Sequence, residues 1–323
     1  MARGLRGGLR LTDPRSIRAG PNRTGRFAPS PTGTLHLGNL RTALLAWLYA
    51  RAQGAPFLLR VEDLDRGRVR ERFEVEQLGD LAAIGLDWDG DVVRQSERTE
   101  LYADALATLD AAGATYPCWC TRAEIREASS APHGPLSEGH YPGTCRRLSG
   151  AQRAEREASG RPPAVRVDAG GAQVAFADRL HGDQVGSVDD FVVRRNDGAY
   201  AYNLAVVVDD GAQGVGEVVR GDDLLDSTPR QLWLADRLGL PRPSFAHVPF
   251  VLGGDGARLA KRHGAVTLAD RAEQGESAAD VRARLAASVG LAAPGESVSA
   301  AQLVARFDPN GFAPPPSGPL PGL

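Results

Sequence analysis

The chain has 323 residues, of which 42% are hydrophobic and 24% are charged, and its formal net charge is −2. This composition is typical of a globular protein with a full core, and the length predicts one large or two smaller domains. The near-neutral charge excludes a generally basic surface, so an RNA partner would need a local patch. No run of residues approaches the length of a transmembrane helix.

Residues 1–25 are one candidate for such a patch, because they carry six arginines and a single aspartate, a net charge of +5. The segment is rich in glycine and arginine and lacks the apolar centre of a secretory signal. A flexible, solvated arm without an RNA partner is the alternative interpretation. We therefore expect a basic flexible arm at the start of the chain.

The first predicted elements are a strand, a sharp turn and a helix within residues 26–41, RFAPSPTGTLHLGNLR. His36 and Asn39 lie where the helix begins, and a helix N-terminus favours an anion in front of it. The next apolar run, residues 56–61, predicts a strand that ends at Glu62. Strand, helix and strand within so few residues indicate a βαβ unit, and ligands of parallel sheets bind at the carboxyl ends of the strands.

Further along the chain, helical periodicity predicts helices over residues 72–84, 98–112, 228–238, 276–289 and 298–307. Ser227 is expected to be the N-cap residue of the third of these helices. The final residues, FAPPPSGPLPGL, are expected to be extended or disordered because they are rich in proline. Apolar runs predict strands over residues 163–174, 188–194, 215–220 and 245–252.

Residues 114–165 interrupt this pattern and contain every cysteine of the chain together with many prolines and glycines. They predict an inserted subdomain with little regular core of its own. Because no export signal is present, the cysteines are expected to be thiols or metal ligands, which favours a cytoplasmic protein. Zinc takes four ligands, so three thiolates would need one more, and reduced buried cysteines without a metal are the alternative.

Lys261 is the only lysine among the 38 basic residues. Its persistence where arginine takes every other basic position indicates a site that needs a compact ammonium group, with chance as the alternative. Lys261 lies in RLAKRHG, residues 258–264, beyond an apolar strand and a glycine-rich turn. A loop of this kind can move, so its ammonium group could follow a phosphate into the transition state.

Residues 26–41 resemble the HIGH-motif region of class I aminoacyl-tRNA synthetases in the form of the glutamyl branch, with Asn39 at the second histidine position. RLAKRHG resembles the KMSKS loop of that class, with Ala260 where serine is usual. The resemblance implies an α/β fold, a Rossmann-like doubly wound parallel sheet, and activation of L-glutamate by ATP with Mg²⁺. It implies catalytic roles for His36, Asn39 and Lys261, and ATP binding by His36, Gly38, Asn39 and Lys261.

The stretches RVEDLDR, AYNLAVVVDD and EVVRGDDLLDSTPRQ also resemble the glutamyl-synthetase core. The glutamate of the first stretch would accept hydrogen bonds from the substrate ammonium group, and arginines would pair with the side-chain carboxylate. From residue type alone, Tyr202 would be a core aromatic and Glu62 a solvated loop carboxylate. The resemblance implies that glutamate is bound by Arg26, Ala28, Ser30, Glu62, Tyr202 and Arg220.

The Cys-x-Cys pair, a Tyr-Pro-Gly step and a further cysteine resemble the zinc site of one stand-alone branch of this family, in which a tyrosine is the fourth ligand. His140 and His133 remain the alternatives to that tyrosine. The resemblance implies a structural zinc ion bound by Cys118, Cys120, Tyr141 and Cys145.

Only 53 residues follow Asp270, fewer than a helical anticodon-binding region needs. The resemblance therefore favours the stand-alone branch, which transfers glutamate to the queuosine base at the wobble position of tRNA(Asp) and activates glutamate without waiting for tRNA. A truncated or split glutamyl-tRNA synthetase that charges tRNA(Glu) is the main alternative. A HIGH-type nucleotidyltransferase and an inactive RNA-binding paralogue are the others.

The expected protein is a monomer without a membrane partner. Its expected parts are a basic arm (1–25), the first half of the catalytic domain (26–113), an inserted zinc-binding subdomain (114–165), the remainder of the catalytic domain with the KMSKS-like loop (166–270), a short helical extension (271–310) and a Pro-rich tail (311–323).

Overall fold

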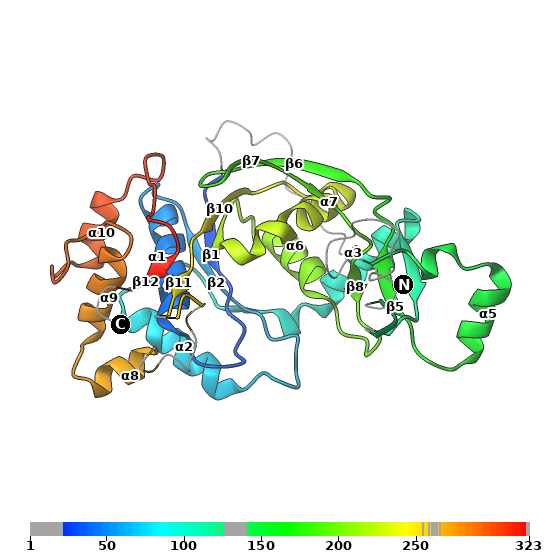
Figure 1. Ribbon diagram of the computed structural model, residues 1–323, viewed down its shortest axis with the longest axis horizontal. Coiled ribbons are helices and arrows are strands. Elements are labelled where there is room, and N and C mark those ends of the chain that lie inside the picture. The colour runs from blue at the N-terminus through cyan, green and yellow to red at the C-terminus, as the bar shows by residue number, and fades with distance from the viewer. Residues whose placement is uncertain are drawn as a thin grey trace, which may run out of the picture.

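A parallel β-sheet core occupies the middle of an elongated molecule in the computed structural model (Figure 1). C-terminal helices form one end and the cysteine-bearing segment the other. Several residues singled out from the sequence lie outside the described part of the chain: residues 1–21 of the arm, His133, His140 and Lys261. The structure describes residues 22–121, 123–125, 141–253, 255–257, 259, 264 and 266–320.

The predicted βαβ unit is confirmed at the start of the described chain. Strand β1 (Gly25–Phe27) runs parallel to β2 (Phe57–Val61), with Arg26 opposite Leu58, and helix α1 (Leu37–Arg51) connects them. Helix α1 is apolar around most of its circumference because it is enclosed between the sheet and the C-terminal helices. Strand β3 (Val93–Arg94) extends this sheet in parallel, after helix α2 (Glu71–Ala83).

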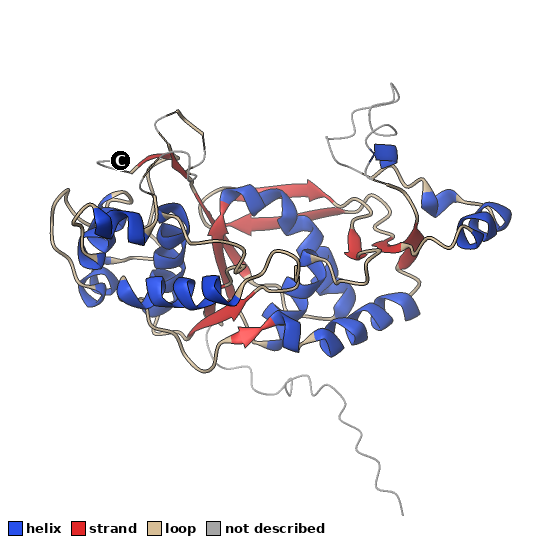
Figure 2. Ribbon diagram, turned by 90° about the horizontal axis from the view of Figure 1, so that it is seen from below, coloured by secondary structure: helices blue, strands red, loops and turns tan. Residues whose placement is uncertain are grey.

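A second sheet continues the core in the order β7-β6-β10-β9. Strand β10 (Ser244–Val248) is parallel to both β6 (Gln173–Asp178) and β9 (Glu217–Gly221), whereas β7 (Gly182–Ser187) is antiparallel to β6. The carbonyl of Thr24 accepts hydrogen bonds from two N–H groups at the start of β9, which joins the two sheets. Seen from below, helices lie on both sides of these strands (Figure 2).

Helix α7 (Thr228–Leu238) connects β9 to β10 with the bounds expected from periodicity. Ser227 is its N-cap residue, as expected, but the residue has helical φ and ψ of −83° and −18°, and its side chain makes no capping hydrogen bond. The reason is that the 3-10 helix η3 (Asp222–Ser227) leads directly into α7. The apolar run before β9 forms most of helix α6 (Tyr202–Ala212), which packs against α3 (Thr99–Ala111) and α7.

A small antiparallel sheet, β4-β5-β8, carries the cysteine-bearing segment. Its strands are β4 (Thr115–Cys118), β5 (Ala164–Val167) and β8 (Val192–Arg194), and the exposed helix α5 (Gly150–Ala158) precedes β5. The single strand predicted over residues 163–174 is wrong, since a turn with positive φ at Gly170 and Gly171 divides it into β5 and the start of β6.

The C-terminal helices α8 (Leu268–Glu273), α9 (Ala278–Ala287) and α10 (Ala300–Arg306) follow Thr267, and α9 and α10 pack against α1. The described part of the Pro-rich tail is extended and ordered, not disordered: β12 (Gly318–Pro319) pairs in parallel with β11 (Val251–Leu252). Leu320 is buried in the core beside them. None of the described helices has the length and apolarity that crossing a bilayer requires.

Candidate active site

A cavity of about 450 Å³ opens where β1, β2, β9 and β10 end, at the carboxyl edge of the parallel strands. This is the edge at which the βαβ pattern placed a ligand. The cavity brings together every ATP- and glutamate-binding residue expected from the sequence within the described chain. These residues are Arg26, Ala28, Ser30, His36, Gly38, Asn39, Glu62, Tyr202 and Arg220.

His36 and Asn39 form a reciprocal cap at the start of α1. The N–H of Asn39 donates to Nδ1 of His36 over 3.2 Å, and the N–H of His36 donates to Oδ1 of Asn39 over 3.1 Å. Burial lowers the pKa of His36, so its ring is neutral and carries its proton on Nε2. The remaining donors are therefore the Nε2–H of His36 and the side-chain NH₂ of Asn39, which are suited to phosphate oxygens.

Gly38 leaves the backbone of this turn open to the cavity. A Cβ atom at Gly38 would lie 3.0 Å from two ring atoms of His36 and 3.5 Å from Cβ of Val251. Any larger residue would therefore push the ring of His36 aside. The glycine allows the backbone to approach a ligand closely.

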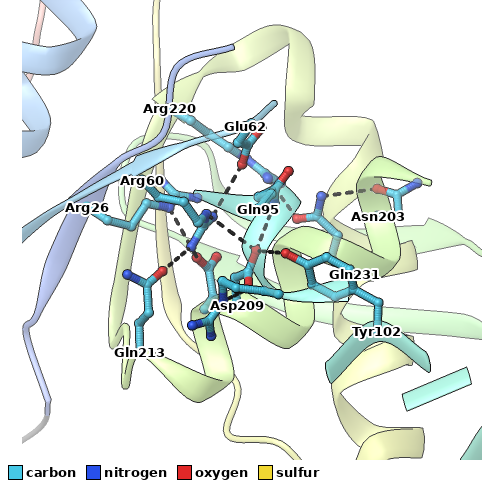
Figure 3. Close-up of polar contacts among 12 residues, drawn as sticks. Arg26, Arg60, Glu62, Gln95, Tyr102, Asn203, Asp209, Gln213, Arg220 and Gln231 are labelled. Atoms are coloured by element: carbon cyan, nitrogen blue, oxygen red, sulfur yellow. Dashed lines mark hydrogen bonds and ion pairs between the residues drawn. The ribbon is translucent and has the colours of Figure 1, made fainter. Parts of the chain in front are cut away.

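Glu62 and Arg26 lie at the ends of β2 and β1 (Figure 3). Burial raises the pKa of Glu62, and Arg60 and Arg26 partly offset that effect. Nη2 of Arg60 donates to Glu62 over 3.3 Å, while Nε of Arg26 donates to Oδ1 of Asp210 over 3.4 Å. Glu62 can thus offer a carboxylate to a cation in the cavity, while the hydrogen bond from Arg60 fixes the position of that carboxylate.

A buried ionic network beneath the cavity was not expected from the sequence. Arg60 is fully buried and donates to Asp210 over 2.7 Å and to Gln213 over 2.8 Å. Burial would raise the pKa of Asp210, but Arg26 and Arg60 more than offset it, so the pKa lies below its usual value. The signals were the single arginine in the apolar strand FLLRV and the acidic pair that ends the apolar run of α6.

Asp209, the other acid of that pair, connects the network to α3. Its carboxylate accepts hydrogen bonds from Gln95 over 2.8 Å, from Arg98 over 2.6 Å and from the hydroxyl of Tyr102 over 2.8 Å (Figure 3). All of these partners lie in or next to α3. The end of β2, which precedes Glu62, is therefore linked through this network to helices α6 and α3.

Arg220, on β9, is held in a different way. Its guanidinium group donates to Gln231 over 2.7 Å, to Thr228 over 2.9 Å and to Nε2 of His247 over 3.0 Å. Among the described residues, none of its hydrogen-bond partners is a carboxylate. Burial lowers the pKa of Arg220, although the group stays charged at neutral pH. A buried cation whose hydrogen-bond partners are all neutral favours an anion beside it.

Tyr202 begins α6 beside the same cavity. Burial and the charge of Glu62 raise the pKa of its hydroxyl, and the charges of Arg220 and Arg26 oppose that rise. The hydroxyl is therefore protonated at neutral pH and can donate to a ligand between these charged groups.

The loop that contains Lys261 begins and ends at the cavity, although Lys261 itself is not described. Val251 and Leu259 line the cavity before it. After it, the carbonyl of Val266 accepts the N–H of Leu37 over 2.8 Å, and Thr267 forms a β-bridge with His36. The loop thus connects two segments that contact the start of α1.

The three cysteines of the chain converge at the far end of the molecule. Their Sγ atoms all lie within 4.8 Å of one another, and Sγ of Cys120 lies 3.4 Å from that of Cys145. The hydroxyl oxygen of Tyr141 lies 3.4 Å from the Sγ atoms of Cys118 and Cys120. Three thiols and a phenol within such distances fit the four-coordinate site that zinc takes.

A guanidinium group lies against this cluster. Arg166 donates to Sγ of Cys118 over 3.2 Å, and its guanidinium carbon lies 3.7 Å from the ring centre of Tyr141. Burial raises the pKa of Cys120 to about 12 in the absence of a metal. A metal cation would reverse that shift because it binds the thiolate form.

Residues 23–294 match the family described as tRNA synthetases class I (E and Q), catalytic domain. A glutamyl-Q tRNA(Asp) synthetase of Nocardia farcinica is 61% identical over 285 residues, which are 88% of this chain and 89% of that protein. A protein of the same name from Symbiobacterium thermophilum is 53% identical over 296 residues, 88% of this chain and 92% of that protein.

Solved structures agree with the sequence relatives. A glutamate tRNA ligase from Elizabethkingia meningosepticum, determined in complex with its amino acid, superposes with a TM-score of 0.79 at 26% identity. The match covers 92% of this chain and 67% of that one.

Proposed function

Because the chain belongs to the class I tRNA synthetases of the E and Q type, we propose that it activates L-glutamate with ATP and transfers it to the queuosine base of tRNA(Asp). Membership of this family makes it a ligase and confirms the resemblance found in the sequence. The name shared by relatives at 61% and 53% identity supports the choice of acceptor.

One observation carries the proposal: a single cavity is lined by the N-terminus of α1, with its two side-chain donors, and by a buried arginine with neutral hydrogen-bond partners. The first feature fits ATP and the second fits the side-chain carboxylate of glutamate. An uncharged side chain such as that of glutamine would leave Arg220 buried without an anion, which costs free energy.

For the activation step, the α-carboxylate of glutamate attacks the α-phosphate of ATP and pyrophosphate leaves. His36 and Asn39 donate to the phosphate oxygens, and Lys261 brings its ammonium group to the phosphates from the loop that borders the cavity. Gly38 provides the open backbone against which ATP lies. Mg²⁺ accompanies ATP and neutralises part of its charge. Positioning and charge stabilisation account for most of the rate increase in such a transfer.

For the amino acid, Glu62 accepts hydrogen bonds from the α-ammonium group, and Arg220 pairs with the side-chain carboxylate. Tyr202 donates from its hydroxyl to the same carboxylate. Arg26 supplies a second positive charge, and the turn after β1 closes the cavity through its backbone and small side chains, Ala28 and Ser30.

A structural zinc ion, bound by Cys118, Cys120, Tyr141 and Cys145, is part of the proposal. Zinc would tie the turn after β4 to the segment before α5, which share only a small apolar cluster around Tyr116 and Trp119 in the described chain. Tyrosine as the fourth ligand is supported by its distances to two of the sulfur atoms.

The domain boundaries expected from the sequence are kept in the proposal, as are a monomeric state and a cytoplasmic location. The segment 114–165 would act as the zinc-binding subdomain and residues 271–310 as the helical extension. Light scattering on the purified protein would test the monomeric state.

ATP–pyrophosphate exchange, run with glutamate in the presence and absence of tRNA, tests the proposed function. We expect exchange with glutamate alone, followed by transfer of labelled glutamate to tRNA(Asp) that carries queuosine but not to the same tRNA without it. Exchange that requires tRNA(Glu) would instead identify a truncated glutamyl-tRNA synthetase. No exchange under either condition would contradict glutamate activation.

A further inference from the structure

A buried histidine–aspartate pair lies behind Arg220, on the side away from the cavity lining. His247 and Asp178 are 0% and 4% exposed, and Nδ1 of His247 lies 2.6 Å from Oδ2 of Asp178. On the other side of the ring, Nε2 of His247 accepts from Nε of Arg220 over 3.0 Å. Neither residue lines the cavity.

The sheet places these three residues in a row. Strands β9 and β10 are parallel, with Arg220 directly opposite His247, and Asp178 ends the neighbouring strand β6. The ring of Phe245 stacks on His247 with 5.8 Å between centroids and 10° between planes. The imidazole is therefore held in one orientation between the carboxylate and the guanidinium group.

Hydrogen-bond chemistry allows only one tautomer in this row. The Nε of arginine can only donate, so Nε2 of His247 must present a lone pair to Arg220. The ring proton is then on Nδ1, which donates to Asp178. The carboxylate of Asp178 also accepts the backbone N–H groups of Leu180 and His181 over 2.9 and 3.0 Å, which keeps it anionic.

We infer that Asp178 and His247 are positioning residues that hold the guanidinium group of Arg220 in the orientation needed for the side-chain carboxylate of the substrate. The inference rests on the proposed function, because it assumes that Arg220 receives that carboxylate. It assigns a role to two residues that contact no substrate atom.

Protonation of His247 would remove the acceptor of the Arg220 Nε–H group and so disturb the orientation of the guanidinium group. A second proton on His247 would place an N–H against the Nε–H of Arg220. Burial lowers the pKa of His247, and the opposing effect of Asp178 does not restore it to 6.5. The charged or titratable groups that face His247 are Asp178 and His181 from the β6 side and Arg220 from β9. The KM for glutamate is therefore expected to rise at acid pH, where His247 gains its second proton.

Asp178→Asn tests the inference. The backbone N–H groups of Leu180 and His181 hold the amide oxygen at the position of Oδ1, so the amide NH₂ faces Nδ1 of His247 and donates to it. The ring must then carry its proton on Nε2, facing Arg220. In ATP–pyrophosphate exchange we expect the KM for glutamate to rise about ten- to a hundredfold, while the KM for ATP changes less than about twofold. Asp190→Asn is the matched control, since Asp190 is equally buried but accepts from the hydroxyl of Tyr116.

His247→Gln and His247→Leu form a second, independent pair of variants. Glutamine retains an acceptor for Arg220 and should keep a lower KM for glutamate than leucine, and it should abolish the rise of KM at acid pH. His181→Asn should retain the rise of KM at acid pH, with its midpoint moved at most slightly upward, because the ring of His181 contacts the carbonyl of His247 and not Arg220.

An unchanged KM for glutamate in Asp178→Asn, or equal rises in the KM values for glutamate and ATP, would overturn the inference. Should circular dichroism show that Asp178→Asn is unfolded, the comparison of His247→Gln with His247→Leu decides, and equal KM values for glutamate would overturn it. A wild-type protein without glutamate-dependent exchange would contradict the proposed function itself, and the inference with it.

Discussion

His36 and Asn39 donate hydrogen bonds to each other at the first turn of α1, so that the cap and the proposed phosphate-binding site consist of the same two side chains. Their reciprocal hydrogen bonds, 3.2 and 3.1 Å long, occupy Nδ1 of the histidine and Oδ1 of the asparagine. Only donors remain for a ligand. The capping bonds thereby orient the donor groups that the proposed function requires.

Asn39→Ala should weaken both the cap and catalysis. Loss of the cap should cost about 1 kcal/mol of unfolding free energy, and loss of the donor should lower kcat for ATP–pyrophosphate exchange about tenfold or more. Gln302→Ala is the matched control, because Gln302 occupies the same capping-box position in α10. Gln302→Ala should lower the free energy of unfolding by a similar amount and leave kcat for ATP–pyrophosphate exchange unchanged. Equal exchange rates for the two variants would contradict a role for Asn39 beyond capping.

Lys261→Arg should be nearly as inactive as Lys261→Ala. The planar guanidinium group does not replace a compact ammonium that follows a phosphate, so both variants should lower kcat about 10²–10³-fold. The KM for glutamate should change little, because Glu62 and Arg220 hold the amino acid. Normal exchange by the alanine variant would show that the single lysine has no catalytic role.

Asp210→Asn should destabilise the protein strongly. It removes a carboxylate shared by two buried arginines. Arg60 keeps Glu62 and Asp209 as partners, but Arg26 loses its ion pair, and breaking a buried pair costs about 3–5 kcal/mol. Asp87→Asn is the comparison, since Asp87 pairs with Arg51 at the surface and should contribute about 0–1 kcal/mol. Urea unfolding measures both values, and similar losses for the two variants would argue against the importance of burial.

The stability supplied by Asp210 should depend on pH in a defined direction. Its pKa is lower in the folded protein than in the unfolded chain, because Arg26 and Arg60 more than offset burial. The contribution is therefore fully present above the unfolded value of about 3.9 and is lost as the pH falls through the lower folded value. Asp210→Asn should show a smaller loss of stability than the wild type over that acid range, and parallel curves would contradict this assignment.

The purified protein should contain about one zinc ion per chain, as expected for a structural four-ligand site. Cys145→Ser and Tyr141→Phe should each reduce the zinc content and lower the melting temperature, and a strong chelator should have the same effect on the wild type. His140→Ala and His133→Ala distinguish the alternatives. Full zinc content in Tyr141→Phe together with loss in either histidine variant would identify that histidine as the fourth ligand.

Local patterns were sufficient for the parts of the fold that form from neighbouring residues. The βαβ unit, α2, α3 and α7 follow from apolar periodicity, and the bounds of α7 agree with the expected ones. Strand β7, GDQVGS, was not expected because its residues are polar and largely exposed, and pairing with β6 alone makes it a strand. The tail became ordered for a similar reason, since β12 pairs with β11 and Leu320 is buried.

The sequence by itself determined where the cavity lies, because the βαβ pattern brings the start of α1 and Glu62 to the carboxyl edge of the parallel strands, and the family resemblance added Arg26, Ala28, Ser30, Tyr202 and Arg220. Only the tertiary structure decided how those residues are held. Arg60 and Asp210 form a hydrogen bond although they are 150 residues apart in the sequence, and His247 and Asp178 are 69 residues apart. Such contacts depend on the order and register of the strands, which periodicity along a single chain does not contain.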